Sequence, residues 1–172
     1  MTNPNKSEKS FKIGILTISD SGYAGKRNID VSGNTISKIC SSKGFVEIFR
    51  DIVPDETKEI REILIRWADS QNVNAIFTTG GTGISPRDIT PEATKSIIDI
   101  EIPGITEFMR RKTSEITPTA ILSRAIAGIR NGCLIINLPG SPKGTQECLE
   151  AILPTLNHTF EMIEGRKSHK DL

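Results

Sequence analysis

Carboxylates and glycine-bearing turns follow four apolar segments that have the length of buried strands. Asp20 follows the first segment and Asp55 the second, while the glycine-rich residues 80–88 follow the third and the turn at residues 139–143 follows the fourth. Because ligands of open parallel sheets bind beyond the carboxyl ends of the strands, we expect these loops to meet at one crevice. Glycine lets backbone N–H groups approach an anion, and a neighbouring carboxylate can hold Mg²⁺ against phosphate oxygens. The pattern therefore indicates phosphate and metal chemistry.

Each of these residues also has a purely structural interpretation. The run Gly80-Gly81-Thr82-Gly83 fits neither the dinucleotide-binding fingerprint nor the P-loop, and a tight turn would explain it. Asp55 follows Pro54, and its role could be purely structural, as the N-cap of the following helix. Ordinary turn or surface roles are equally open for the other polar candidates, which are Arg87, Asp88, Ser123, Arg124 and Asn137.

Histidine and cysteine chemistry has little support in this chain. His158 and His169 are its two histidines, so a histidine-rich zinc site is not expected, and any catalytic pair with histidine depends on one of them. The three cysteines, Cys40, Cys133 and Cys148, form no CxxC pattern. We interpret them as reduced thiols in the core.

Four predicted strands must position the candidate residues. They lie at residues 11–19, 45–53, 73–79 and 132–138. The first, third and fourth are nearly continuous apolar runs, which are typical of strands covered on both faces in a parallel sheet. The second alternates apolar and polar residues.

Helical patterns separate these strands. The clearest helix begins near Asp55 and buries a face that includes Ile60 and Trp67, and a shorter one ends at Gly44. The remaining helices are expected near residues 92–100, near residues 120–129, and from Ser141 with Pro142 in its first turn, where Pro154 should kink or divide the helix.

The alternation of strands and helices predicts an α/β fold with three layers, α/β/α, around a mostly parallel sheet. A chain of 172 residues fits one domain. We place this single domain at residues 11–165, between a flexible N-terminal tail at residues 1–10 and a C-terminal tail at residues 166–172.

The charge balance argues against a nucleic-acid or membrane-surface partner. Lys and Arg number 22 against 21 Asp and Glu, a formal net charge of +1. No apolar run approaches the roughly 20 residues of a bilayer-spanning helix, and residues 1–6 lack the apolar region of a signal peptide. We therefore expect a cytoplasmic protein that binds neither nucleic acid nor membrane.

One long stretch resembles a known family signature. Residues 78–94 read Thr-Thr-Gly-Gly-Thr-Gly-Ile-Ser-Pro-Arg-Asp-Ile-Thr-Pro-Glu-Ala-Thr, which closely resembles the signature of the molybdopterin adenylyltransferase family (MogA/MoaB type, similar to the G domain of gephyrin). The resemblance continues through residues 16–20, 53–56, 102–105, 121–125, 127–130 and 134–142. It spans nearly the whole chain after the N-terminal tail.

The resemblance implies a molybdopterin-binding fold, usually a homotrimer, with a pterin site beside a nucleotide site. The implied reaction transfers AMP from Mg²⁺-ATP to the terminal phosphate of molybdopterin and releases pyrophosphate. ATP and molybdopterin are the implied substrates, Mg²⁺ is the implied cofactor, and a downstream molybdenum-insertion protein is the implied partner.

The resemblance also implies roles for individual residues. Asp55 and Asp88 match the two critical aspartates, with catalytic and metal-binding roles. The implied pterin- and nucleotide-binding positions are Ser19, Asp20, Gly81, Thr82, Gly83, Ser123, Asn137, Gly140, Ser141 and Pro142. Arg87, Arg124 and Lys143 are weaker candidates for contacting phosphate.

Two other functions stay open on the sequence alone. A non-catalytic molybdopterin-binding or scaffold module of the same fold would keep the crevice, although the presence of both Asp55 and Asp88 argues against it. An unrelated doubly wound nucleotide hydrolase would explain the glycines and carboxylates but not the long ordered match.

Overall fold

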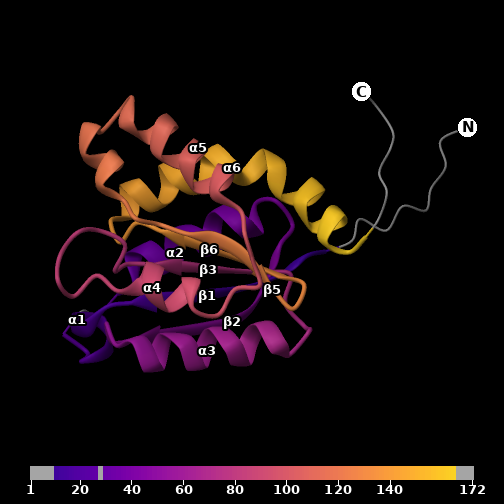
Figure 1. Cartoon of the computed structure of the whole chain (residues 1–172), viewed down its shortest axis with the longest axis horizontal. Helices are drawn as coiled ribbons and strands as arrows, with labels where there is room; N and C mark the ends of the chain where they lie inside the picture. Colours follow the sequence, from indigo (N-terminus) through magenta and orange to yellow (C-terminus); the bar gives the residue numbers. More distant parts are fainter. Residues whose placement is uncertain (1–9, 27–28, 166–172) are drawn as a thin grey trace, which may run out of the picture.

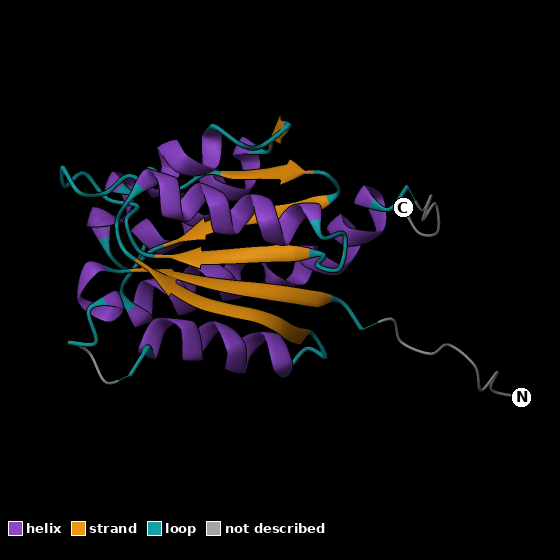
Figure 2. Cartoon of the chain, turned by 90° about the horizontal axis from the view of Figure 1, so that it is seen from below, coloured by secondary structure: helices purple, strands orange, loops and turns teal. Residues whose placement is uncertain are grey.

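A six-stranded mixed sheet forms the centre of the molecule in the computed structural model, which describes residues 10–26 and 29–165. The spatial order of its strands is β2-β1-β3-β6-β5-β4. The strands are β1 (Lys12–Ile18), β2 (Val46–Val53), β3 (Ala75–Thr79), β4 (Ile100–Glu101), β5 (Ala127–Arg130) and β6 (Cys133–Leu138). The four strands β2, β1, β3 and β6 are parallel, so their carboxyl ends meet at one edge, where the loops gather on the left of Figure 2.

Helices cover both faces of this sheet (Figure 1). The chain forms α1 (Asp20–Tyr23), α2 (Val31–Ser41), α3 (Thr57–Asp69), α4 (Thr90–Lys95), α5 (Pro103–Ser114), the 3₁₀ helix η1 (Pro118–Leu122) and α6 (Pro142–Ile163). Helices α2, α5 and α6 lie on one face, and α3 and α4 lie on the other. The predicted three-layer α/β/α fold is confirmed.

Two hydrophobic clusters, one on each face of the sheet, hold the layers together. Alternation along β1 sends Ile13 and Ile15 to the cluster under α2 and α6, and sends Leu16 to the cluster under α3. Every residue of β3 and β6 is buried, as expected for central parallel strands. Both hydrophobic clusters are therefore built on the same sheet. The predicted tails at residues 1–10 and 166–172 lie, apart from Ser10, outside the described residues.

The four predicted strands are confirmed as β1, β2, β3 and β6, and the cysteines lie in the core as predicted. Cys40, Cys133 and Cys148 are all buried and free. Burial raises the pKa of the Cys40 and Cys133 thiols to about 12, which makes them unreactive near neutral pH.

The helix predicted near residues 120–129 is wrong. The chain forms η1 and then the strand β5, which pairs antiparallel with both β6 and β4. In β5, Ala127 and Ile129 pair with Ile136 and Leu134 at the two-residue period of a strand. A Cβ on Gly128 would lie 2.6 Å from the Ile100 carbonyl oxygen, so the absence of a side chain allows β4 to approach.

Two other helix boundaries also differ from prediction. The helix expected at residues 92–100 ends at Lys95, because Asp99 N–H donates to the Ile129 carbonyl and Ile100 pairs with β5. Helix α6 begins with the predicted Ser141 cap but continues past Pro154 to Ile163, so Pro154 does not divide it.

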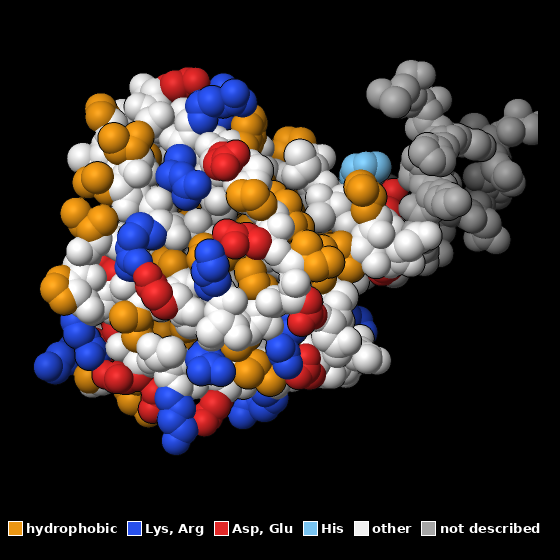
Figure 3. Space-filling view, in the orientation of Figure 1, with side chains coloured by type: hydrophobic (Ala, Val, Ile, Leu, Met, Phe, Trp, Pro, Cys, Tyr) orange, Lys and Arg blue, Asp and Glu red, His pale blue; other side chains and the backbone are white. Residues whose placement is uncertain are grey.

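The surface carries both charge signs. Figure 3 shows Lys and Arg side chains interspersed with Asp and Glu on the visible face, as the net charge of +1 suggests. Among the described residues, no helix is both long enough and apolar enough to cross a membrane.

Candidate functional site

A sharp glycine turn leads from β3 into the site. Gly80 has a φ of +105°, and a Cβ there would overlap the carbonyl oxygen of Ile18 at the end of β1. Gly81 has a φ of +63°, and a Cβ there would overlap the Thr90 hydroxyl and lie 3.1 Å from Asp55 Oδ1. Only glycine fits this path, which lays the turn across β1 and against the Asp55 carboxylate.

A second loop, residues 139–141, packs beside the first. A Cβ on Gly140 would lie 3.2 Å from Gly80 Cα. The Pro139 carbonyl accepts hydrogen bonds of 2.6 Å from the Thr79 and Thr145 hydroxyls. Ser141 then caps α6, its Oγ accepting a hydrogen bond from Gly144 N–H at 3.2 Å. The N-terminus of a 22-residue helix therefore faces the glycine turn, a favourable place for an anion.

Asp20 and Asp55 lock together the loops that follow β1 and β2. Asp20 N–H donates to Asp55 Oδ2 and Asp55 N–H donates to Asp20 Oδ1, both at 3.0 Å. Arg87 reaches over from the third loop and pairs with Asp20 and Glu56, each at 2.9 Å. The predicted meeting of these strand-end loops is thus confirmed.

Asp55 is not a helix cap, since α3 begins at Thr57 and its N-cap residue is Glu56. Partial burial raises the pKa of Asp55 above its ordinary value, and the charges of Asp20 and Asp88 act in the same direction. The Asp20 backbone N–H and the Arg87 charge oppose this rise. By contrast, the pKa of Asp20 is lowered, first by the hydrogen bond from the Asp55 backbone and then by Arg87.

Asp88 lies on the other side of the glycine turn. Its Oδ2 accepts a hydrogen bond of 2.8 Å from Ser85 N–H. The same oxygen lies 2.9 Å from the position that a Cβ on Gly83 would take. The two aspartates predicted to be critical therefore flank one turn, with Asp55 against Gly81 and Asp88 against Gly83.

Arg124 fixes the conformation of this turn. Its backbone N–H donates to the Thr82 carbonyl at 2.8 Å, and its guanidinium donates to the carbonyls of Gly83 at 2.7 Å and Asp88 at 2.5 Å. The guanidinium also pairs with Glu92. Arg124 thus positions the loop, which is more than an ordinary surface role.

We expect Arg124→Lys to loosen the loop while retaining the positive charge beside Glu92. The lysine ammonium group cannot reproduce the planar guanidinium, whose separate N–H groups reach both carbonyls. Each hydrogen bond from a charged group contributes about 1.5–3 kcal/mol to stability. Hydrogen exchange of the residue 83–88 amides should accelerate about tenfold or more. The matched control is Arg66→Lys on α3, and equal exchange in the two variants would contradict this role.

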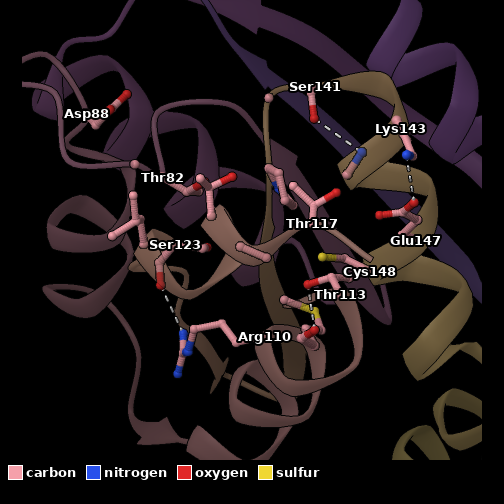
Figure 4. Close-up of a pocket in the computed structure, with 18 of the residues that line it drawn as sticks. Thr82, Asp88, Arg110, Thr113, Thr117, Ser123, Ser141, Lys143, Glu147 and Cys148 are labelled. Carbon is pink, nitrogen blue, oxygen red and sulfur yellow. Dashed lines mark hydrogen bonds and ion pairs between the residues drawn. The ribbon is translucent and has the colours of Figure 1, made fainter. Parts of the chain in front are cut away.

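A cavity of about 660 Å³ opens between these loops and helices α5 and α6 (Figure 4). This volume is typical of small-molecule sites. Met109, Leu122 and Cys148 give it apolar walls, while Thr82, Asp88 and Ser123 reach it from the loops. The cavity thus has an apolar side and a polar side, and the polar side lies beside the glycine turn.

The structure gathers most predicted site residues at this cavity. Those that line it are Gly81, Thr82, Gly83, Asp88, Ser123, Gly140 and Ser141, together with Lys143. Ser19 and Pro142 instead line a smaller pocket of about 280 Å³ near the ends of β1 and β2. Asp20 is exposed, and Asp55 is not among the lining residues, although its Oδ1 lies beside Gly81, which is one of them.

Asn137 lies away from the cavity and is fully buried. Its amide donates to the Thr78 and Thr94 hydroxyls, both at 2.9 Å, and its Oδ1 accepts from Ile126 N–H at 3.2 Å. These bonds tie β6 to β3, α4 and the segment before β5. Asn137 therefore supports the loops through the backbone.

Helices α5 and α6 supply cavity residues that the sequence analysis did not name as site residues. They include Arg110, Thr113 and Glu147. The Arg110 guanidinium donates to the carbonyls of Ser123 and Ala125 at 3.3 Å and to the Thr106 hydroxyl at 3.4 Å. These partners are neutral, and no ion pair of Arg110 occurs within residues 10–26 and 29–165. Its charge can serve an anionic ligand.

The carboxylates at the glycine turn could bind a hard cation such as Mg²⁺ together with a bound ligand. Within the described part of the chain, no group of three or more His, Cys, Asp or Glu side chains is placed to hold a metal by itself. Mg²⁺ commonly takes one or two carboxylates and completes its shell with water and substrate phosphates. Asp55 and Asp88 supply carboxylates of that kind.

Comparison with known proteins identifies the family of this chain. Residues 14–158 match the family model described as "Probable molybdopterin binding domain". The molybdopterin adenylyltransferase of Helicobacter pylori strain J99 is 43% identical over 159 residues, which cover 91% of this chain and 90% of that protein. Dictyostelium discoideum gephyrin is 37% identical over 172 residues, which cover 94% of this chain and 24% of gephyrin.

A solved structure agrees with the sequence matches. The molybdopterin biosynthesis enzyme MoaB from Thermus thermophilus superposes with a TM-score of 0.85 at 46% identity, covering 90% of this chain and 97% of that one. The family match includes the glycine turn, both aspartates and the α6 N-terminus, which all lie within residues 14–158. The chain belongs to the molybdopterin-binding domain family of molybdenum cofactor biosynthesis proteins.

Proposed function

We propose that this protein is a molybdopterin adenylyltransferase of molybdenum cofactor biosynthesis. It transfers AMP from ATP to the terminal phosphate of molybdopterin and releases pyrophosphate. One observation carries the proposal: two aspartates flank a glycine turn at the mouth of a ligand-sized cavity. Relatives named for this activity match 91% and 83% of the chain.

The reaction joins two anions, so the site must bring phosphates together and neutralise them. A molybdopterin phosphate oxygen forms a bond to the α-phosphorus of ATP, and the bond from that phosphorus to pyrophosphate breaks. Asp55 and Asp88 would hold Mg²⁺, which supplies charge neutralisation at the phosphates. The α6 N-terminus, Lys143 and Arg110 add positive potential around the cavity.

The two pockets suggest how the substrates divide. Ser141 and Lys143 line the large cavity, whereas Pro142, between them in sequence, lines the smaller pocket with Ser19. Asp55 contacts Asp20 on one side and the glycine turn on the other. We assign molybdopterin to the large cavity and ATP to the surface beside Ser19 and Asp20, so that Asp55 lies where the two phosphates would meet.

Purified protein with Mg²⁺-ATP and molybdopterin tests the proposal. Pyrophosphate and adenylylated molybdopterin should appear in equal amounts. Molybdopterin binding without product would favour the non-catalytic pterin module, and pyrophosphate release without molybdopterin would favour a nucleotide hydrolase.

The pH dependence should follow Asp55. Its carboxylate form is required to hold the metal, so activity should fall as pH decreases through its raised pKa. Arg87 favours the carboxylate, and therefore Arg87→Gln should raise this pKa further and move the acidic limb of the kcat/KM profile to higher pH. Arg61→Gln on α3 is the control, and coincident limbs in the two variants would contradict the assignment to Asp55.

The proposal also includes a homotrimer, a molybdenum-insertion protein that receives the product, and a cytoplasmic location. An apolar groove of about 610 Å³ between α5 and α6, lined by residues such as Phe108 and Ile152, supports self-association. Three buried free thiols support a reducing compartment.

A further inference from the structure

Glu147 is a shielded carboxylate on the cavity wall. It lies on α6, and its side chain is 18% exposed. In Figure 4 it borders the opposite side of the cavity from Asp88. Its next residue in sequence, Cys148, belongs to the apolar wall.

The Glu147 carboxylate is short of hydrogen-bond donors. Its partner within the described residues is Lys143 Nζ at 3.7 Å, beyond hydrogen-bond distance, and that lysine side chain is 73% exposed. Other shielded carboxylates differ. Asp30, 11% exposed, accepts bonds from Thr17 and Gly33, and Glu47, 27% exposed, accepts bonds from Ser37 and Arg50. No side-chain oxygen among the described residues is both buried and unpartnered, so the unpaired Glu147 oxygens are accessible, and the residue lines the cavity. Glu147 therefore has free acceptor capacity within reach of a ligand in the cavity.

The chemistry of a pterin supplies the matching donors. Its pyrimidine edge presents an amino group at C2 beside a ring N3–H, two parallel donors at the spacing of the two oxygens of a carboxylate. Paired hydrogen bonds to a carboxylate are strong and orient a planar ring. With the ligand phosphate at the glycine turn beside Asp88, the pterin end would extend toward the far wall, where Glu147 lies.

We propose that Glu147 binds the amino and N3–H edge of the pterin and makes the cavity specific for this ring. This inference rests on the proposed function, because it takes molybdopterin as the ligand. The competing roles are binding of the nucleotide ribose hydroxyls and a plain surface ion pair with Lys143 on the same helix face.

The first test measures KM for both substrates in Glu147→Gln. Glutamine keeps the size of the side chain but replaces one acceptor with a donor that opposes the ligand N–H. The KM for molybdopterin should rise about 10- to 100-fold, while the KM for ATP and the unfolding midpoint stay nearly unchanged. Glu150→Gln is the matched control, because Glu150 lies one turn further along α6, outside the large cavity, beside Gln146. Equal KM values in the two variants, a rise confined to ATP, or a loss of stability alone would overturn the proposal.

The second test separates this inference from the catalytic proposal. Pterin and lumazine differ at C2, where lumazine has an oxo group in place of the amino group, and their intrinsic fluorescence reports binding directly. Wild-type protein should prefer pterin by about tenfold or more, and Glu147→Gln should lose that preference. Equal wild-type binding of the two probes overturns the role of Glu147. A pterin preference without adenylylation supports Glu147 and contradicts the proposed activity. Binding of neither probe overturns the role of Glu147, whereas the proposed activity is decided by the assay of product formation alone.

Discussion

Asp88→Asn is expected to reduce adenylylated molybdopterin formation about 10²- to 10³-fold while molybdopterin still binds. Asparagine can still accept the hydrogen bond from Ser85 N–H, so the turn around Gly83 should keep its shape. The variant loses the negative charge through which the side chain would hold a cation against the phosphates. The effect should therefore appear in kcat, measured by pyrophosphate release, and not in the affinity for the pterin.

Asp99→Asn provides the matched control for this prediction. Asp99 accepts a hydrogen bond of 2.8 Å from Asn131 N–H, as Asp88 does from Ser85, but it lies beside the short edge strand β4 and away from the cavity. Its variant should keep wild-type kcat. Full activity in Asp88→Asn, or an equal loss in both variants, would contradict a catalytic role for Asp88.

The central part of the fold was predictable because its strands are buried on both faces. The apolar runs that became β1, β3 and β6 have the length and continuous apolar character that is typical of strands in a covered parallel sheet. The edge of the sheet was not predictable in the same way. Strand β5, Ala127–Arg130, has four residues, which is too few to show the two-residue alternation of a strand in the sequence. Its conformation is decided by pairing with β4 and β6.

The loop side of the site was predictable from topology, and the helix side was not. Asp55 and the glycine turn follow parallel strands, so they had to meet at one edge. Helix α5 was missed because its buried stripe contains Thr106 and Thr113 beside Met109, which weakens the apolar signal. Arg110 lies on this helix, so its place in the cavity could not be inferred. The buried position of Asn137 depends on three tertiary hydrogen bonds, which no local pattern encodes.

Gly80→Ala is expected to cause the largest loss of stability among the substitutions considered. The new methyl group would overlap the Ile18 carbonyl oxygen, which belongs to the backbone of a central strand and cannot rotate away. The φ of +105° adds a conformational cost of about 1–2 kcal/mol. With the overlap included, the free energy of unfolding should fall by about 3–5 kcal/mol, measured by urea denaturation. Product formation should be lost as well, since the turn also carries Gly81 and its contact with Asp55.

Gly44→Ala separates the two contributions to that loss. Gly44 also has a positive φ, +78°, but a Cβ there would have no heavy atom within 4 Å. Its variant should therefore lose only the conformational part, about 1–2 kcal/mol, and should keep activity. The difference between the two variants measures the close approach of the glycine turn to β1. If both lost the same stability, the turn would have to lie farther from the Ile18 carbonyl, and Gly80 would be required for its φ alone.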